Sequence, residues 1–156
     1  MASDAVPSTQ EVGNTSAYFD VSISKKKLYP LLLLASASEI DGTTRFHKLM
    51  FILKQEYGVP IDQKFIKYHY GPFSSDLRDD INFFVENGFV DQKSEFLGED
   101  GNGFPVIKTT YCLSEKGNKI ASEAFDDTEK GKFAEVVSKW KNASLKDVIA
   151  HAKSLL

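Results

Sequence analysis

The residues that could carry chemistry in this 156-residue chain are few and far apart. His47, His69 and His151 show neither the HxxxH nor the HExxH spacing that holds a metal ion on one helix face. The single cysteine, Cys112, lies beside Tyr111, in a segment where a thiol is more often a small buried hydrophobe than a nucleophile. We therefore expect no catalytic residue, no metal ligand and no bound cofactor.

Two polar clusters have simpler explanations than ligand binding. Asp76, Asp79 and Asp80 lie at i, i+3 and i+4, and carboxylates near a helix N-terminus are stabilised by the helix dipole. The segment 100–103 lacks the glutamate that a calcium loop places at its twelfth position. Its glycines do not precede a helix, as they would in a phosphate-binding loop. We expect this segment to be a turn.

A cationic surface for nucleic acid is the next chemistry to consider. The formal net charge of −3 gives no global attraction to phosphates. The basic residues that could contact DNA are Lys25, Lys26, Lys27, Arg45 and Lys48. Arg78 and Asn82 are of types that pair with guanine and adenine, but the segment 75–87 carries four carboxylates against its one arginine. Nucleic acid is therefore the alternative partner.

The same segment suits a protein partner better. Phe83 stands beside the apolar stripe on an otherwise polar face, and an aromatic side chain with a polar rim is typical of an interface anchor. The competing interpretation is that Phe83 folds against the preceding aromatic segment and belongs to the core. The residues expected to contact a partner are Arg78, Asp79, Asn82 and Phe83.

The elements that would position these residues follow from caps, turns and the spacing of apolar side chains. Thr43 or Thr44, Ser74 or Ser75, and Ser114 are placed to cap helices. Glycine and asparagine residues over 98–103 tolerate the positive φ that a hairpin loop needs. Helices are predicted over 27–40, 43–57, 75–87, 115–125, 127–140 and 145–155, and strands over 64–70, 89–96 and 104–113.

This order of elements predicts an α+β, predominantly helical fold: a winged helix-turn-helix with extra C-terminal helices. Residues 1–23 lack periodicity and read as a disordered tail, and residues 24–156 form the domain. Segment 68–77 is an aromatic strand that turns at Gly71 and Pro72 into a helix, with Tyr68 and Tyr70 expected to pack between the second and third helices. No membrane span or signal peptide is apparent, so the expected location is the cytoplasm.

Three segments resemble a known group of proteins. They are Lys48-Leu49-Met50, Tyr70-Gly71-Pro72-Phe73-Ser74 and Tyr111-Cys112-Leu113-Ser114. Together they are similar to the Panacea and YwgA-like families of small prokaryotic winged-helix proteins, over roughly residues 28–155. The family's usual tyrosine is Phe73 here. The resemblance implies a winged-helix fold and, for Panacea members, antitoxin or adaptor roles.

These observations predict a non-catalytic regulatory module that acts through protein–protein contact, of antitoxin or adaptor type. The alternative is a DNA-binding winged-helix transcription regulator, and an uncharacterised enzyme ranks last. A monomer and a homodimer are both compatible with the sequence, which does not identify the partner.

Overall fold

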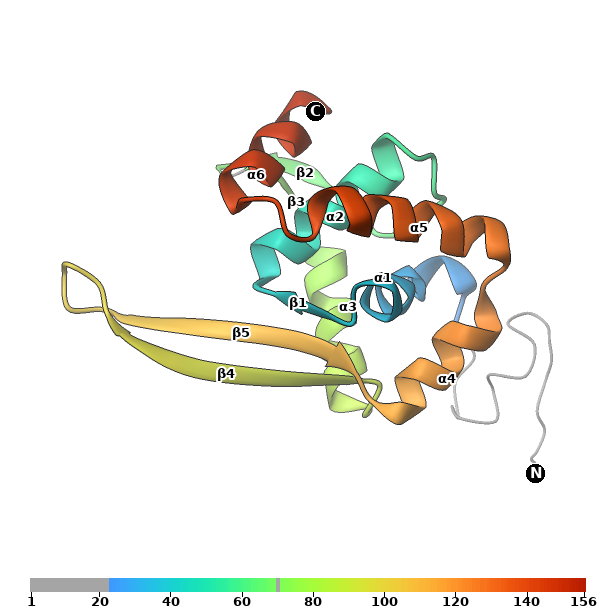
Figure 1. The fold of residues 1–156 in the computed structure, drawn as a ribbon, viewed down its shortest axis with the longest axis horizontal. Coiled ribbons are helices and arrows are strands. Elements are labelled where there is room, and N and C mark those ends of the chain that lie inside the picture. The colour runs from blue at the N-terminus through green and yellow to red at the C-terminus, as the bar shows by residue number, and fades with distance from the viewer. Residues whose placement is uncertain (1–22, 70) are drawn as a thin grey trace.

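The computed structural model in Figure 1 describes residues 23–69 and 71–156. Tyr70 and nearly all of the predicted tail over 1–23 lie outside the described residues. The described part is α+β and mainly helical with six α-helices, as the sequence predicted, and it has two small antiparallel sheets. No helix within it has the length and apolar character needed to cross a membrane.

The helical elements of the described part comprise one short 3₁₀ turn and six α-helices. They are a 3₁₀ turn η3 (Lys25–Lys27) and the α-helices α1 (Tyr29–Ala37), α2 (Thr43–Gln55), α3 (Ser75–Glu86), α4 (Glu115–Ala124), α5 (Asp127–Trp140) and α6 (Leu145–Ser154). The strands are β1 (Glu39–Asp41), β2 (Ile66–Tyr68), β3 (Gly71–Phe73), β4 (Val90–Glu99) and β5 (Pro105–Leu113).

Helix α1 is shorter than its apolar run predicts. The expected helix over 27–40 stops at Ala37, because Ser38 takes a φ of 71° that no helix continues. Ile40 then belongs to strand β1, pairs with Tyr111 of β5 and is buried. This strand was missed because three residues give no alternating pattern long enough to detect.

The larger sheet has the order β1-β5-β4, and its long β4–β5 hairpin projects well beyond the helices (Figure 1). Its inner end is fixed by Val90 and Tyr111, which are buried against the helices. Glycines and asparagine close the outer end, close to the predicted position. The second sheet pairs β2 with β3.

The helix caps explain where most helices begin. Ser74, Ser114 and Ser144 each accept a hydrogen bond from a backbone N–H in the first turn of α3, α4 and α6. Helix α2 differs from prediction: Gly42, with a φ of 87°, stands at its N-cap, and Thr43 is already its first residue. Gly42 donates its N–H to the carbonyl of Thr109, which joins this helix start to the sheet.

A single apolar cluster runs through the described residues. Helix α1 is buried along most of its length, and α5 and α4 pack against it. Helix α6 packs on α2 and β3. The predicted packing of Tyr68 between the second and third helices is wrong, because its side chain is 57 % exposed on β2. All three residues of β2 are exposed.

Candidate functional site

Among the described residues, polar and aromatic side chains gather where α2, α3 and β3 meet. His47 of α2 stacks on Phe73 of β3, with ring centroids 4.8 Å apart and planes at 9°. Its Nδ1 lies 2.9 Å from the carbonyl oxygen of Thr43, and its Nε2 lies 3.0 Å from that of Ser74. Both ring nitrogens lie within hydrogen-bond distance of the protein's own backbone carbonyls, and the stacked ring positions Phe73.

The environment of His47 favours its neutral form. Burial of the imidazole is the largest effect and lowers its pKa below the ordinary value, against the two carbonyl contacts that would raise it. The nearby cations of Lys48 and Arg78 lower the pKa of His47 further. A neutral ring can donate only one proton to its two carbonyl partners.

Lys48 connects two of the segments that carried the family resemblance. Its amine is buried and donates to the carbonyl oxygen of Pro72 at 2.9 Å. Burial lowers the pKa of Lys48, and the charge of Lys153 lowers it further. Lys48 therefore holds strand β3 against α2. This amine is not available on the surface for a phosphate. The sequence predicted that the chain turns at Gly71 and Pro72, but both residues pair with β2 as part of β3.

Gly71 allows this arrangement to close. Its φ is 99°, in the region that favours glycine. A Cβ at this position would lie 3.2 Å from Cγ of Lys153 and 3.5 Å from Cε of Lys48. The Gly71-Pro72 pair is thus explained by backbone conformation and by the approach of two lysines, one from α2 and one from α6.

Two shallow hollows flank Phe73. One, of about 160 Å³, extends toward Tyr68 and Gly71. The other, of about 110 Å³, extends toward α3 and Tyr111. We use the name Phe73 surface for five of the residues that line them: Thr43, His47, Phe73, Arg78 and Asn82. The two predicted α3 residues Arg78 and Asn82 thus share one surface with the turn motif.

The other two predicted contact residues occupy the next row of α3. Asp79 and Phe83 are one turn apart, as are Arg78 and Asn82. The guanidinium of Arg78 lies 5.8 Å from the ring centre of Phe73, and its Nε lies 3.4 Å from Oδ1 of Asp79. Phe83 is 39 % exposed. These four side chains form one continuous stretch of α3 beside the Phe73 surface.

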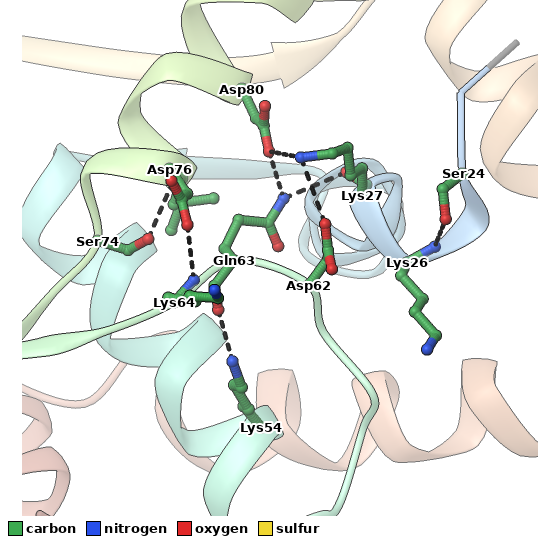
Figure 2. A network of polar contacts seen from close by, with 11 residues as sticks. Ser24, Lys26, Lys27, Lys54, Asp62, Gln63, Lys64, Ser74, Asp76 and Asp80 are labelled. Atoms are coloured by element: carbon green, nitrogen blue, oxygen red, sulfur yellow. Dashed lines mark hydrogen bonds and ion pairs between the residues drawn. The ribbon is translucent and has the colours of Figure 1, made fainter.

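Two other carboxylates of α3, those of Asp76 and Asp80, serve the fold (Figure 2). Oδ2 of Asp76 accepts the backbone N–H of Lys64 at 3.1 Å. Oδ2 of Asp80 accepts from the buried amide of Gln63 at 2.7 Å and lies 3.9 Å from the amine of Lys27. Burial raises the pKa of Asp80, and the hydrogen bond from the Gln63 side-chain amide opposes this by lowering it. Sequence inspection missed Gln63, because nothing in its neighbours signals a partner on a helix 17 residues away.

The basic residues proposed for DNA are mostly engaged within the chain. The guanidinium of Arg45 donates to the carbonyl oxygens of Trp140, Lys141 and Ala143 at 3.3, 3.1 and 2.8 Å, so it caps the end of α5. Amines of two lysines pair with carboxylates: Lys25 with Glu129 at 2.9 Å, and Lys27 with Asp62 at 3.3 Å. Lys26 is exposed. With Lys48 buried, these five residues do not present a common row of cations.

The other candidate residues for chemistry lie elsewhere. His151 contacts Oε1 of Glu56 at 2.7 Å and stacks on Trp140, and His69 is exposed beside the ring of Tyr68. Cys112 is half-buried on β5. In the part of the chain that the structure describes, no three His, Cys, Asp or Glu side chains gather as metal ligands. The absence of a cofactor stays a prediction.

Two residues of this region were not singled out for function from the sequence. Thr43 was expected only as a helix cap, and Tyr111 only as part of the hairpin, yet both line the hollow beside Arg78. Tyr111 is buried, and burial raises the pKa of its phenol.

Comparison with protein-family models, curated proteins and solved structures finds no match to this chain.

Proposed function

We propose that this protein is a non-catalytic winged-helix module that acts by contact with another protein, as an antitoxin or an adaptor does. The winged-helix interpretation is supported by the position of β1 between α1 and α2, and by the hairpin that follows α3. It is also supported by the sheet order β1-β5-β4, which places the hairpin's second strand centrally. The contact surface comprises the Phe73 surface with Asp79 and Phe83.

The observation that carries this proposal is the composition of the open face of α3. Arg78, its one cation, already lies beside the carboxylate of Asp79, so little positive charge is left for a phosphate backbone. Phe83 adds an exposed ring, and the shallow hollow beside Arg78 offers a concave site. An aromatic anchor with a polar, partly charged rim is the pattern of a protein interface.

A DNA-binding regulator is the second candidate, and the order α2, α3, hairpin favours it, because this arrangement delivers α3 to a major groove. Affinity would have to come from exposed cations near α3 and the hairpin. They include Arg78, which pairs with Asp79, Lys93, and Lys116, which donates to the carbonyl of Asn87; the half-buried Lys108 lies 3.6 Å from Asp41.

A DNA titration separates the two candidates. The labelled full-length protein is mixed with duplex genomic DNA fragments at about 50 mM and about 200 mM salt. We expect no submicromolar binding at either salt concentration. Submicromolar binding that weakens steeply with salt and is lost in Arg78→Ala, but kept in Lys26→Ala, would overturn the proposal in favour of DNA.

A crosslinking experiment tests the protein contact directly. A photoreactive amino acid replaces Phe83 in the full chain, and exposed Ser138 of α5 is replaced in the same way as the matched control. Expressed in the native cells, the variant at position 83 is expected to give a discrete heavier product that the control lacks. Adding Arg78→Glu should remove that product. Equal products from both positions, or none from position 83, would contradict the proposal.

A further inference from the structure

The outer half of the β4–β5 hairpin exposes an unusual amount of apolar surface. Phe96 and Leu97 of β4 are 61 % and 55 % exposed, and Phe104 at the loop is 65 % exposed. Val106 and Ile107 of β5 are also exposed. The hairpin projects from the helical body, so no helix covers either face there (Figure 1). Phe96 and Ile107 lie opposite each other on one face of the hairpin, and exposed apolar side chains gathered in this way mark an interaction site.

Strand β4 forms an open edge of its sheet in the described residues, since it pairs only with β5. The direction of its backbone groups follows from the other side of β5. The carbonyl of Thr109 accepts from Gly42, so it points toward β1 and away from Ser94, its partner on β4. In an antiparallel ladder, the N–H and C=O of Ser94 then point outward, and those of Gln92 and Phe96 do so as well.

The geometry points to a second copy of this chain as the occupant of that edge. We propose that two copies pair antiparallel through β4, with the two-fold axis at Ser94, to form a continuous intermolecular sheet. Ser94 then faces Ser94 of the second copy, and Gln92 faces its Phe96. The stretch 92–96 is symmetric about this axis, and the irregularity between Phe96 and Glu99 ends the regular edge just beyond it.

Charge complementarity favours this register over the two adjacent ones. With the axis at Ser94, Lys93 lies opposite Glu95 of the second copy, in two symmetric pairs on one face of the sheet. Moving the axis by one residue in either direction places Lys93 or Glu95 opposite its own copy, which is repulsive. Among the described residues, neither side chain forms an ion pair within its own chain, so both are available.

The same pairing accounts for the apolar tip. In an antiparallel arrangement, the outer end of each hairpin runs alongside the inner end of the other. Phe96 is on the face that carries Val90 and Tyr111, which pack against the helices, so the tip moves from solvent toward the body of the second copy. Burial of this surface adds hydrophobic stabilisation to the backbone hydrogen bonds. The inference stands independently of the partner proposed for α3.

The test is sedimentation of the full chain over about 1 µM to about 1 mM protein. We expect a concentration-dependent dimer in the parent protein. Lys93→Glu and Glu95→Lys each replace two attractive pairs by two repulsive ones and should weaken the dimer about tenfold. The double variant K93E/E95K restores complementarity and should restore the parent affinity. A general effect of either substitution on folding or solubility would not be reversed in this way.

A proline variant tests the intermolecular backbone hydrogen bonds separately. Ser94→Pro removes an N–H that points away from β5, so the hairpin itself loses no ladder hydrogen bond. We expect Ser94→Pro to retain the parent circular dichroism spectrum and to sediment as a monomer. A parent protein that stays monomeric throughout would leave the edge to a strand of another protein and overturn the proposal. A dimer that is indifferent to all four variants would overturn it as well.

Discussion

At the scale of single residues, several buried or partly buried polar side chains hold the fold together. His47 and Lys48 follow one another on α2, and both contact backbone carbonyls of the segment around Phe73. Arg45 uses one nitrogen to approach three carbonyls at the end of α5. Each buried polar group needs such a partner, because leaving it unpaired is costly. These residues therefore position the Phe73 surface and hold the C-terminal helices in place.

His47 gives a prediction about pH. Burial lowers its pKa in the folded protein, so the unfolded chain binds more protons than the folded one once the pH falls through about 6.5. The free energy of unfolding should therefore decrease from about pH 7.5 to about pH 5.5 through this residue, and the decrease ends at the folded pKa. His47→Gln should remove this part of the pH dependence, because glutamine does not titrate.

The measurement is urea unfolding of the parent and His47→Gln over that pH range. The stability advantage of the parent should shrink as the pH falls, while carboxylates affect both proteins alike. Parallel pH profiles for the two proteins would show that His47 keeps its ordinary pKa, and a growing advantage at low pH would show that it is raised.

At the scale of elements, helix α4 packs directly against the backbone just before the hairpin. Gly117 lies in the first turn of α4, and Ser114 before it donates its hydroxyl to the carbonyl of Gly88 and its N–H to that of Phe89. A Cβ at Gly117 would overlap the carbonyl oxygen of Phe89 and touch Leu113. A glycine in a helix is usually a weakness, but here it lets α4 approach the backbone where β4 begins.

Two glycine substitutions test this packing. Gly117→Ala should lower the free energy of unfolding by about 2 kcal/mol or more, because the overlapped atom is backbone and cannot move alone. Gly131→Ala is the matched control on α5, where nothing lies within 4 Å of the added methyl. It should raise stability by about 0.5–1 kcal/mol through helix propensity. Similar effects at the two positions in urea unfolding would contradict the close approach.

At the scale of the whole molecule, the helices after the hairpin share one apolar cluster with those before it. Phe133 of α5 stacks beside Tyr29 of α1, and Val148 of α6 belongs to the same cluster. Trp140, the single tryptophan, stacks on His151 at 4.5 Å and so joins α5 to α6. The C-terminal helices are therefore part of the body that supports the hairpin and the Phe73 surface.

This shared core predicts cooperative unfolding. Tryptophan fluorescence reports on α5 and α6, whereas far-ultraviolet circular dichroism reports on every helix. In urea at low protein concentration, the two signals should give coincident transitions, as expected for one cooperative unit. An earlier fluorescence transition would show that α5 and α6 detach first.

Local signals in the sequence were sufficient for much of the fold. Ser74 and Ser114 cap helices as their spacing predicted, and Leu77, Ile81 and Phe84 form the buried stripe of α3. The hairpin loop was identified by its glycines. These features are decided within a few residues, by φ preferences, capping and apolar periodicity, so they can be recognised without knowing the rest of the chain.

Only the tertiary structure decided which polar side chains remain available to a partner. Arg45 was expected on a cationic surface but caps a helix about a hundred residues away, and Asp80 was expected only as a carboxylate near a helix N-terminus but binds Gln63. Strand β1 and the exposure of Tyr68 were likewise set by distant neighbours. The physical reason is that a charged side chain has the same local pattern whether it meets water or a partner. The sequence alone thus proposed Arg78, Asp79, Asn82 and Phe83, whereas tertiary packing placed them beside Phe73.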